Sequence, residues 1–559
     1  MTGDRVLQAT LALALTRFNE RRFAEAQALY RQALIEAPNN ADALNMLGLV
    51  FAETGNPLQA LKHIDQALRL EPQRAAFHTN RGEVLRRWGL LEEGLEACRR
   101  AAELDPNAPE VRNNMGLALL GKGAFAEALP HIRAALALRA DMPQAYFNLG
   151  RALKGLGEWH EALGALQKAV SCAPSYAEAW YELAIVQERM DDLDASLASS
   201  TRALQLRSDL PELWVARGDA LTTLGNIGEA IDAYRAALKV DAGFAVARYQ
   251  LALGLLGRGE YAEGWQQYES RSDPMIPGGV TAPMLPMPQW QGEAMAGERL
   301  LVLTEQGYGD HIQFCRFVPQ LADRGIEVVM GASPELGALT ATLRGVSRVV
   351  TQVEEAWASG AHRWTFVGSL PHRLGVDARN LGMTQPYLQA DAGRVAAWRH
   401  RLSALGGALK VGLVWAGRPS HGNDWRRSIP PEQFAPLAAI RGIAFVAMQV
   451  GEAADQRRGR AGALSMLDVG SELGDFANTA ALVCATDLLI TVDSASAHLA
   501  GALGRPVWNL LPLMPDWRWR GDEERSRWYP TMRLFRQRHR DDWAEVIGRV
   551  ADALADYRP

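Results

Sequence analysis

Asp493 and His498 stand five residues apart in the stretch TVDSASAHLAGALGRPVW. The uncharged run Leu488–Val492 before the aspartate is typical of a buried parallel strand, and the small residues after the histidine are typical of a helix packed closely on its sheet. Ligands of such folds bind at the carboxyl ends of strands, and helix N-termini attract anions. The amides that follow, those of Ser494 and Ala495 among them, could therefore hold a phosphate. The pattern alone is a weak indication, because any doubly wound protein contains several such units.

A second candidate lies in the stretch GYGDHIQF, a few residues after another apolar run, 300–303. Gly309 lets a ligand approach the backbone closely, because glycine has no side chain. Asp310 would stand at the top of a strand, where a carboxylate can take a proton from a hydroxyl as general base. The alternative is that Asp310 caps the N-terminus of the following helix, and without further context the residues favour this alternative.

A third candidate is the polar stretch HGNDWRRSIP, which follows the apolar run VGLVWAG. It contains His421, Arg426 and Arg427 above the end of an expected strand. Guanidinium groups offer paired donors to phosphate oxygens, so this loop suits a diphosphate. A solvated loop without a ligand is an equally good interpretation.

The elements that would position these residues begin at Arg299, where short apolar runs start to alternate with helical stretches. This alternation predicts parallel α/β units. The expected strands are 300–303, 326–330, 364–367, 411–415, 443–448 and 488–492. The segment 385–409 has the character of a connection between two similar halves. We therefore expect two doubly wound sheets that face each other across a cleft.

The N-terminal half is a repeat array with a period of 34 residues. Small residues recur at this spacing in three series: Gly48, Gly82, Gly116, Gly150, Ala184, Gly218 and Ala252; Ala26, Ala60, Gly94, Ala128, Ala162, Ser196, Ala230 and Gly264; and Ala33, Ala67, Ala101, Ala135, Ala169, Ala203 and Ala237. Prolines at positions 38, 72, 106 and 174 mark repeat ends. The array resembles the tetratricopeptide repeat, which has this period. It predicts an α-helical superhelix of about eight helix pairs, from residue 6 to about residue 272.

Asn80, Asn114 and Asn148 occupy the same position in three successive repeats. If that position faces the groove of the superhelix, the three amides form a ladder that can bind an extended acceptor peptide without reading its sequence. The alternative is that the asparagines bridge neighbouring repeats.

The domain boundaries follow from changes in composition. Residues 1–272 form the repeat array, and 273–298 form a linker interrupted by five prolines, with enough apolar residues to pack against a neighbour. Residues 299–390 form the first α/β half, and 391–559 form the second half, which we expect to bind a nucleotide-sugar.

Composition excludes several function classes. The net charge is −5 over 559 residues, with basic and acidic residues interspersed, which argues against a nucleic-acid binder. The four cysteines are scattered without metal-ligand spacing, so we expect a reduced compartment and no zinc site. No stretch of about twenty apolar residues spans a bilayer, and we expect a cytoplasmic protein. An arginine-rich stretch from Arg518 to Arg540, interleaved with aromatic residues, could border an acidic donor or acceptor, but it is more typical of a solvated face.

The α/β region, about 299–558, resembles the ADP-heptose:lipopolysaccharide heptosyltransferases, which have a GT-B fold of two facing Rossmann-like halves. The matching motifs are Gly309-Asp310, a basic loop with Arg427, and Asp-x-x-x-x-His at Asp493 and His498. The resemblance implies that Asp310 is the catalytic base and that Arg427 contacts the donor phosphate. It also implies that the segment from Asp493 through Ser494 and Ala495 to His498 holds the donor. The family usually has Asp-Thr-Gly where this chain has Asp-Ser-Ala, so the identity of the donor stays open.

The fusion of the two regions resembles the nucleocytoplasmic O-linked N-acetylglucosamine transferase in layout. It is more similar to bacterial repeat-containing glycosyltransferases of flagellin O-glycosylation, in motifs such as VGLVWAG and PDWRW. The resemblance implies an inverting, metal-independent transferase that moves a sugar from a nucleotide-sugar to Ser or Thr of a protein acceptor such as flagellin. No cofactor is expected, since the nucleotide-sugar is a substrate, and neither is a nucleic-acid partner. Two alternatives stay open: a glycolipid acceptor, or a non-catalytic scaffold that keeps the fold.

Overall fold

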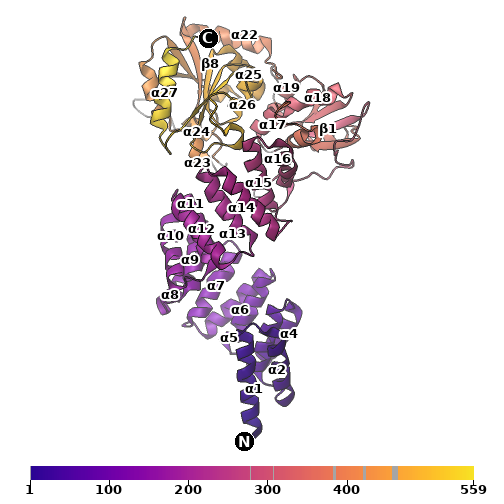
Figure 1. The fold of residues 1–559 in the computed structure, drawn as a ribbon, viewed down its shortest axis with the longest axis vertical. Helices are drawn as coiled ribbons and strands as arrows, with labels where there is room; N and C mark the ends of the chain where they lie inside the picture. The colour runs from indigo at the N-terminus through magenta and orange to yellow at the C-terminus, as the bar shows by residue number, and fades with distance from the viewer. Residues whose placement is uncertain are drawn as a thin grey trace. The chain divides into compact units, whose positions relative to one another are not determined.

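The computed structural model describes residues 2–276, 278–305, 307–381, 386–419, 424–455 and 464–558. The chain divides into two compact units, Met1–Ala220 and Leu221–Pro559 (Figure 1). The second unit begins inside the repeat array, about fifty residues before the boundary at 272 that the sequence suggests.

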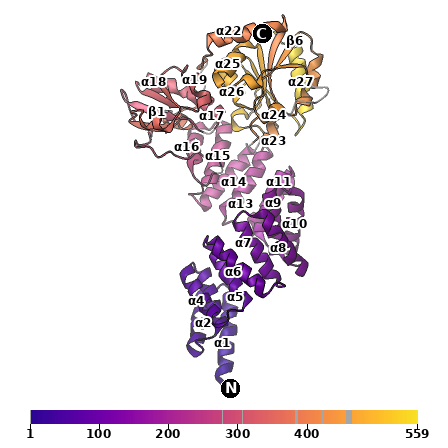
Figure 2. The same ribbon diagram turned by 180° about the vertical axis from the view of Figure 1, so that it is seen from behind.

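The first unit consists of antiparallel helix pairs, seen from two sides in Figures 1 and 2. Its helices are α1 (Thr2–Asn19), α2 (Phe23–Glu36), α3 (Ala41–Glu53), α4 (Pro57–Leu70), α5 (Ala75–Arg87), α6 (Leu91–Leu104), α7 (Pro109–Gly121), α8 (Phe125–Leu138), α9 (Pro143–Leu156), α10 (Trp159–Cys172), α11 (Ala177–Arg189) and α12 (Leu193–Leu206). The array continues through α13 (Pro211–Thr223), α14 (Ile227–Val240), α15 (Ala245–Arg258) and α16 (Tyr261–Tyr268). The described residues before 277 thus contain sixteen α-helices, and the predicted superhelix of about eight pairs is confirmed.

Small residues at the 34-residue spacing let the helices of each pair approach closely. A Cβ atom built on Gly48 would lie 2.6 Å from Cγ1 of Ile64, and one built on Gly150 would lie 2.5 Å from Cγ of Leu166. Only glycine fits at these crossings, because such distances are too short for a carbon contact. The third alanine series is completely buried: Ala33, Ala67, Ala101, Ala135, Ala169, Ala203 and Ala237.

A periodic side-chain contact also holds the repeats. Five side chains separated by multiples of 34 residues each bond the backbone carbonyl six residues earlier. The pairs are His78 with Pro72, Arg112 with Pro106, Trp180 with Pro174, Trp214 with Ser208 and Arg248 with Ala242. Each acceptor lies just beyond the C-terminus of a helix, where backbone carbonyls lack intrahelical partners. The contacts therefore fix the turn between consecutive repeats.

The second unit contains two parallel sheets. The first consists of β1 (Arg299–Leu303), β2 (Glu327–Gly331), β3 (Val346–Val350) and β4 (Arg363–Phe366) in the order β3-β2-β1-β4. The second consists of β5 (Leu409–Val414), β6 (Ile443–Ala447), β7 (Met466–Asp468), β8 (Leu488–Val492), β9 (Val507–Leu511) and β10 (Met532–Arg536) in the order β10-β9-β8-β5-β6-β7. All the pairings between these strands are parallel, which confirms the predicted α/β class.

Helices cover both faces of the six-stranded sheet (Figures 1 and 2). One face of the four-stranded sheet is covered by helices, and the other packs against linker residues such as Leu285 and Met287. The helices around the two sheets are α17 (Tyr308–Phe314), α18 (Val318–Asp323), α19 (Pro334–Thr340), α20 (Val353–Trp357), α21 (Leu370–Leu374), α22 (Ala392–Leu402), α23 (Asp424–Arg427), α24 (Glu452–Asp455), α25 (Phe476–Ala485), α26 (Ala495–Ala502) and α27 (Trp543–Ala555). Along β8, Leu489 packs in the core that contains α25 and α26, and Ile490 packs in the core that contains α27. Successive strand residues point to opposite faces, so the two helical layers sandwich the six-stranded sheet.

The last repeat helices belong to the core of the α/β unit. The ring of Trp265, on α16, lies 5.9 Å from the ring of Phe314 and 5.6 Å from that of Trp517. Both contacts are edge-to-face, a favourable arrangement for aromatic pairs. The repeat array is thereby fused to the α/β region through a shared hydrophobic core.

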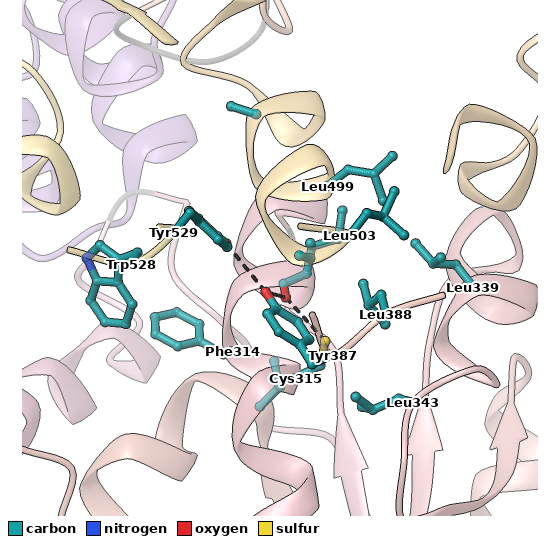
Figure 3. Packing of buried hydrophobic residues seen from close by; sticks show 14 of the residues in the cluster. Phe314, Cys315, Leu339, Leu343, Tyr387, Leu388, Leu499, Leu503, Trp528 and Tyr529 are labelled. Carbon is teal, nitrogen blue, oxygen red and sulfur yellow. Dashed lines mark hydrogen bonds between the residues drawn. The ribbon is translucent and has the colours of Figure 1, made fainter. Parts of the chain in front are cut away.

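Figure 3 shows how the connection between the sheets is fixed. The hydroxyl of Tyr387 donates to the carbonyl of Ile312, 2.8 Å away, and lies 3.5 Å from the hydroxyl of Tyr529. Beside it the buried guanidinium of Arg316 donates to the carbonyl of Trp528 at 2.9 Å. These contacts join α17 of the first sheet to the segment that precedes β10 of the second.

The proline-rich linker, 273–298, contains both buried and exposed apolar residues. Trp290 is buried, and its backbone amide donates to the carbonyl of Trp364 at 2.7 Å. Met284, another apolar residue of the linker, is 92% exposed and does not pack against a neighbour.

Candidate active site

Asp310 lies in the first turn of α17, directly beyond the carboxyl end of β1. The helix begins after Gly307 and has no side-chain cap, so the interpretation of Asp310 as an N-cap is wrong. Its Oδ1 accepts a hydrogen bond from Nη2 of Arg518. Its Oδ2 lies close over Gly307, where a built Cβ atom would be 2.5 Å away. Glycine at 307 therefore allows the carboxylate to fold back over the backbone.

Arg518 is a site residue that sequence reasoning missed. It lies in the 3-10 turn Trp517–Trp519, and its side chain is only 9% exposed. Besides Asp310, it donates to Oε1 of Gln313 and, at 2.9 Å, to Oδ1 of Asp516. The prediction that this stretch forms a solvated face is therefore wrong for Arg518. The available signal was that PDWRW follows β9, because loops at the carboxyl ends of strands carry ligand-binding residues.

The electrostatic surroundings make Asp310 a stronger base than an exposed aspartate. Burial raises the pKa of its carboxyl above the usual range. The positive charge of Arg518 lowers this pKa in part, and the negative charge of Glu305 raises it. A carboxylate with a raised pKa holds an abstracted proton better, which suits a general base near neutral pH.

Gly309 brings the first sheet into contact with the helix that follows β8. A Cβ atom built on Gly309 would lie 3.0 Å from Cδ2 of His498 and 3.8 Å from Cα of Ala495. His498 is buried, and its Nδ1 lies 2.9 Å from the hydroxyl of Tyr529. Burial holds the pKa of His498 well below its usual range, so the imidazole is neutral near pH 7.

Asp493 comes directly after β8 and stands among other charges. Burial and the neighbouring carboxylate of Asp516 raise its pKa to about 6, and the charge of Arg427 counteracts the shift. Ser494 is the N-cap of α26, and its Oγ lies 3.0 Å from Oγ1 of Thr491. The N-terminus of α26 therefore begins beside a titratable carboxyl and an arginine.

Arg427 is held by a small polar cluster after β5. Its Nε donates to Oδ1 of Asp424 at 3.1 Å, and the hydroxyl of Ser428 donates to Oδ2 of the same carboxylate at 2.9 Å. A Cβ atom built on Gly417 would lie 2.6 Å from Nη2 of Arg427, so a larger residue there would displace the guanidinium.

The other two residues of this loop have different positions. Arg426 lies over the ring of Trp425, 4.7 Å from its centre, and Trp425 is 42% exposed. His421 lies outside the described residues. Of the predicted donor-binding residues, the structure thus gathers Gly309, Ala495 and His498 in direct contact and places Asp493 within the electrostatic reach of Arg427.

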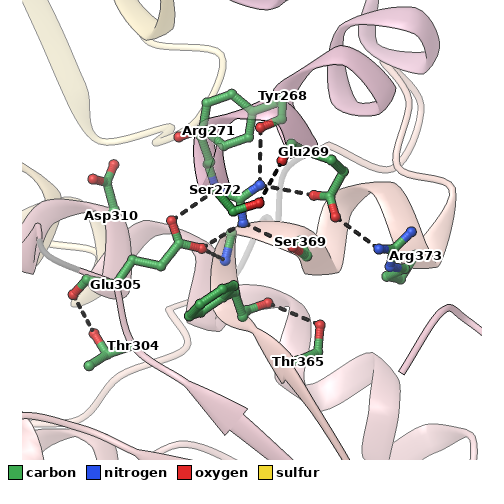
Figure 4. A network of polar contacts seen from close by, with 12 residues as sticks. Tyr268, Glu269, Arg271, Ser272, Thr304, Glu305, Asp310, Thr365, Ser369 and Arg373 are labelled. Carbon is green, nitrogen blue, oxygen red and sulfur yellow. Dashed lines mark hydrogen bonds and ion pairs between the residues drawn. The ribbon is translucent and has the colours of Figure 1, made fainter. Parts of the chain in front are cut away.

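A buried polar network supports the loop after β1 (Figure 4). Arg271, just after α16, donates from Nη2 to Oε1 of Glu305 at 2.7 Å and to the hydroxyl of Ser369 at 2.9 Å. Both partners of the ion pair are 5% exposed, and Glu269 provides a second carboxylate. Because breaking such a pair leaves an uncompensated buried charge, the network fixes the end of the repeat array to the loop that carries Asp310.

The asparagine ladder shows contacts between repeats. Nδ2 of Asn80 donates to Oδ1 of Asn45 at 3.1 Å, and Nδ2 of Asn148 donates to Oδ1 of Asn113 at 3.0 Å. Asn148 is buried, whereas Asn114 is partly exposed. Two of the three amides therefore bridge neighbouring repeats, and binding of an acceptor by these asparagines stays a prediction.

Within the part of the chain that the structure describes, no cluster of three His, Cys, Asp or Glu side chains is arranged to hold a metal ion. In the same part, none of the helices combines the length and hydropathy needed to cross a bilayer.

Comparison with known proteins supports the repeat array. Residues 11–61, 53–109, 113–177 and 149–211 match one tetratricopeptide repeat family, and residues 211–244 match another. The N-terminal half therefore carries tetratricopeptide repeats.

A curated relative extends the likeness beyond the repeats alone. Protein FlbA of Caulobacter vibrioides is 28% identical in an alignment of 390 residues, and the match covers 63% of this chain and 63% of FlbA. The match thus spans less than two thirds of the relative's length.

Two solved structures resemble part of this chain. The Cut9-Hcn1 tetramer structure of the APC/C has a TM-score of 0.40 and 20% identity, covering 47% of this chain and 52% of that one. A tetratricopeptide repeat protein from Parabacteroides merdae has a TM-score of 0.37 and 16% identity, covering 45% of this chain and 99% of that one.

Proposed function

We propose that this chain is an inverting, metal-independent glycosyltransferase that moves a sugar from a nucleotide-sugar to a Ser or Thr hydroxyl of a protein. The observation that carries the proposal is the convergence of loops from both sheets. Asp310 and Gly309 follow β1, Asp493 and His498 follow β8, and Arg518 follows β9. Arg518 bonds Asp310, Gly309 lies beside His498, and the charge of Arg518 acts on Asp493. Buried ionised groups are costly, and strongly shifted pKa values such as that of Asp493 are typical of functional sites.

In the proposed reaction the acceptor oxygen attacks the anomeric carbon of the donor. The bond between that carbon and the phosphate oxygen breaks, and the proton of the hydroxyl moves to Asp310. Attack from the face opposite the leaving group inverts the anomeric configuration. The nucleotide leaves with the bonding electrons, and a positive charge must stabilise its phosphate.

Arg427 and the N-terminus of α26 are the groups that we assign to the leaving phosphate. Guanidinium groups and helix N-termini both favour phosphate oxygens. Preorganised groups of this kind stabilise the charge that develops in the transition state, and in the proposed mechanism they take the role that a metal has in other enzymes. Asp493, Ser494, Ala495 and His498 would orient the donor.

The acceptor is a protein in this proposal because the chain carries a long tetratricopeptide array, a surface that suits extended peptides. Flagellin is the candidate acceptor to test first, from the resemblance of the sequence to flagellin-modifying transferases. We assign the asparagines Asn80, Asn114 and Asn148 to acceptor binding only as part of this proposal.

A thermal-shift screen against UDP-, GDP-, ADP- and CMP-linked sugars tests the donor site. We expect one nucleotide class to raise the melting temperature of the wild type, because a ligand that binds the native state stabilises it. Arg427→Ala should abolish the shift, and Arg441→Ala, which removes an exposed arginine before β6, should keep it. Absence of a shift with all four classes would contradict the proposal.

Asp310→Asn tests the chemistry separately. It should abolish sugar transfer to a flagellin acceptor and preserve the thermal shift, because the amide cannot accept the proton. Unaltered turnover would remove Asp310 from the mechanism.

A further inference from the structure

A cavity of about 100 Å³ opens beside the carboxylate of Asp310. Two of its walls come from the last repeats, through Tyr249 of α15 and Tyr268 of α16. Arg271 and the turn at Gly278–Val280 form another wall, and Gly307 with Asp310 closes the cavity on the side of β1. The cavity therefore lies where the repeat array meets the loop that carries the proposed base.

The walls of this cavity are held rigidly. The guanidinium of Arg271 lies 4.7 Å above the ring of Tyr268, and the ring of Tyr249 is stacked 6.0 Å from that of Tyr268. The backbone amide of Val280 donates to the carbonyl of Arg271 at 3.0 Å, which ties the turn to the end of the array. A site held in this way is preorganised and loses little freedom when a ligand enters.

The two oxygens of Asp310 have different surroundings. Oδ1 is bound by Arg518, on the side of the second sheet. Oδ2 lies over Gly307, which lines the cavity. A hydroxyl group in the cavity would therefore face Oδ2, the carboxylate oxygen that does not bind Arg518. This oxygen can accept the proton of the hydroxyl.

We propose that this cavity receives the hydroxyl-bearing side chain of the acceptor, so that the last repeat pair is part of the acceptor site. The proposal rests on the transferase function proposed above. Pockets for whole ligands are roughly 300–1,000 Å³, so a cavity of about 100 Å³ admits a side chain the size of Ser or Thr and excludes a sugar ring or a Tyr side chain. The phenol groups of Tyr249 and Tyr268 can donate to and accept from a hydroxyl or a peptide group.

The test uses the full-length chain, the nucleotide-sugar that stabilises it, and three peptides that differ only in a central Ser, Thr or Tyr. We expect transfer to the Ser and Thr peptides and none to the Tyr peptide. Tyr249→Phe should raise KM for the Ser peptide about tenfold and leave the Kd of the donor unchanged. Tyr249→Trp, which fills the cavity, should reduce transfer further with the same donor affinity. Tyr261→Phe is the matched control, because Tyr261 lies on α16 outside the cavity.

The outcomes separate the two proposals. Transfer with an unchanged KM in both Tyr249 variants, or equal transfer to the Tyr peptide, would overturn the acceptor cavity and leave the transferase function intact. A wild type that neither binds a nucleotide-sugar nor modifies any peptide would overturn the transferase function itself. Loss of donor binding in Tyr249→Phe would also contradict the inference, because the cavity would then belong to the donor.

Discussion

The contact between Arg518 and Asp310 can be measured with a double-mutant cycle. The variants are Arg518→Gln, Asp310→Asn and the combination of both. The Arg518 side chain is 9% exposed and that of Asp310 is 36% exposed, so the pair lies between a surface pair and a buried one. Surface pairs contribute roughly 0–1 kcal/mol, and breaking a fully buried pair costs about 3–5 kcal/mol. We therefore expect a coupling free energy of about 2 kcal/mol, about a thirtyfold change in the equilibrium constant.

The sign of the pH dependence follows from the charges. Arg518 lowers the pKa of Asp310 against the effect of burial, so Arg518→Gln should raise that pKa further. The acid limb of kcat/KM should then move to higher pH. The coupling should also shrink as the pH falls through the pKa of Asp310, because a protonated carboxyl carries no charge to attract the guanidinium.

Urea unfolding of the full chain, followed by tryptophan fluorescence, provides the assay. Trp517, Trp519 and Trp528 are buried close to the pair and report on the second unit. Measurements at about pH 7.5 and at successively lower pH show how the coupling changes as the carboxyl takes up a proton. Additive effects of the two single changes, within about 0.5 kcal/mol at the higher pH, would refute the reasoning.

Three more predictions concern other parts of the molecule. The pKa of Asp493 is raised to about 6 in the folded chain. The stability that its protonated carboxyl contributes is therefore fully present below the pKa of the unfolded chain and is lost as the pH rises through about 6. Asp493→Asn should make the free energy of unfolding, measured with urea, less dependent on pH in this range. Gly417→Ala should push Arg427 from its place and weaken donor binding about tenfold by calorimetry, whereas Gly407→Ala, where a Cβ meets nothing within 4 Å, should bind normally. Asn148→Ala should lower the free energy of unfolding of the first unit by about 1–3 kcal/mol, because it leaves the amide of Asn113 without its partner; an unchanged denaturation midpoint would contradict the bridging contact.

The sequence predicts the architecture well because both regions are strongly periodic. The 34-residue spacing locates the helix pairs, and all six expected strands are present as β1, β2, β4, β5, β6 and β8. The four missed strands have weaker signals. β3 is largely exposed, β7 has only three residues, and β10 alternates with arginine, so none of them forms a continuous apolar run. β9, VWNLL, carries a polar residue at its centre and follows closely on α26.

The site was predictable where a residue follows a strand, and less so where two distant segments meet. Asp310 and Asp493 were found because each lies in the loop or turn that follows an apolar run. Arg518 was missed because its burial depends on Asp310 and Gln313, about two hundred residues earlier in the chain. Tyr249 and Tyr268 looked like ordinary repeat residues, and only the packing of α15 and α16 brings them to the cavity beside Asp310.

The shared core of α16 and the α/β region has a consequence for how such chains can be built and changed. Trp265 cannot leave the aromatic cluster of Phe314 and Trp517 without opening the core of the second unit. Cutting the chain at residue 272 would therefore expose that core on both fragments, whereas the division between the compact units falls near the end of α13. The repeats before α13 form a module that an engineer can lengthen, shorten or replace, whereas α14, α15 and α16 must stay with the α/β region.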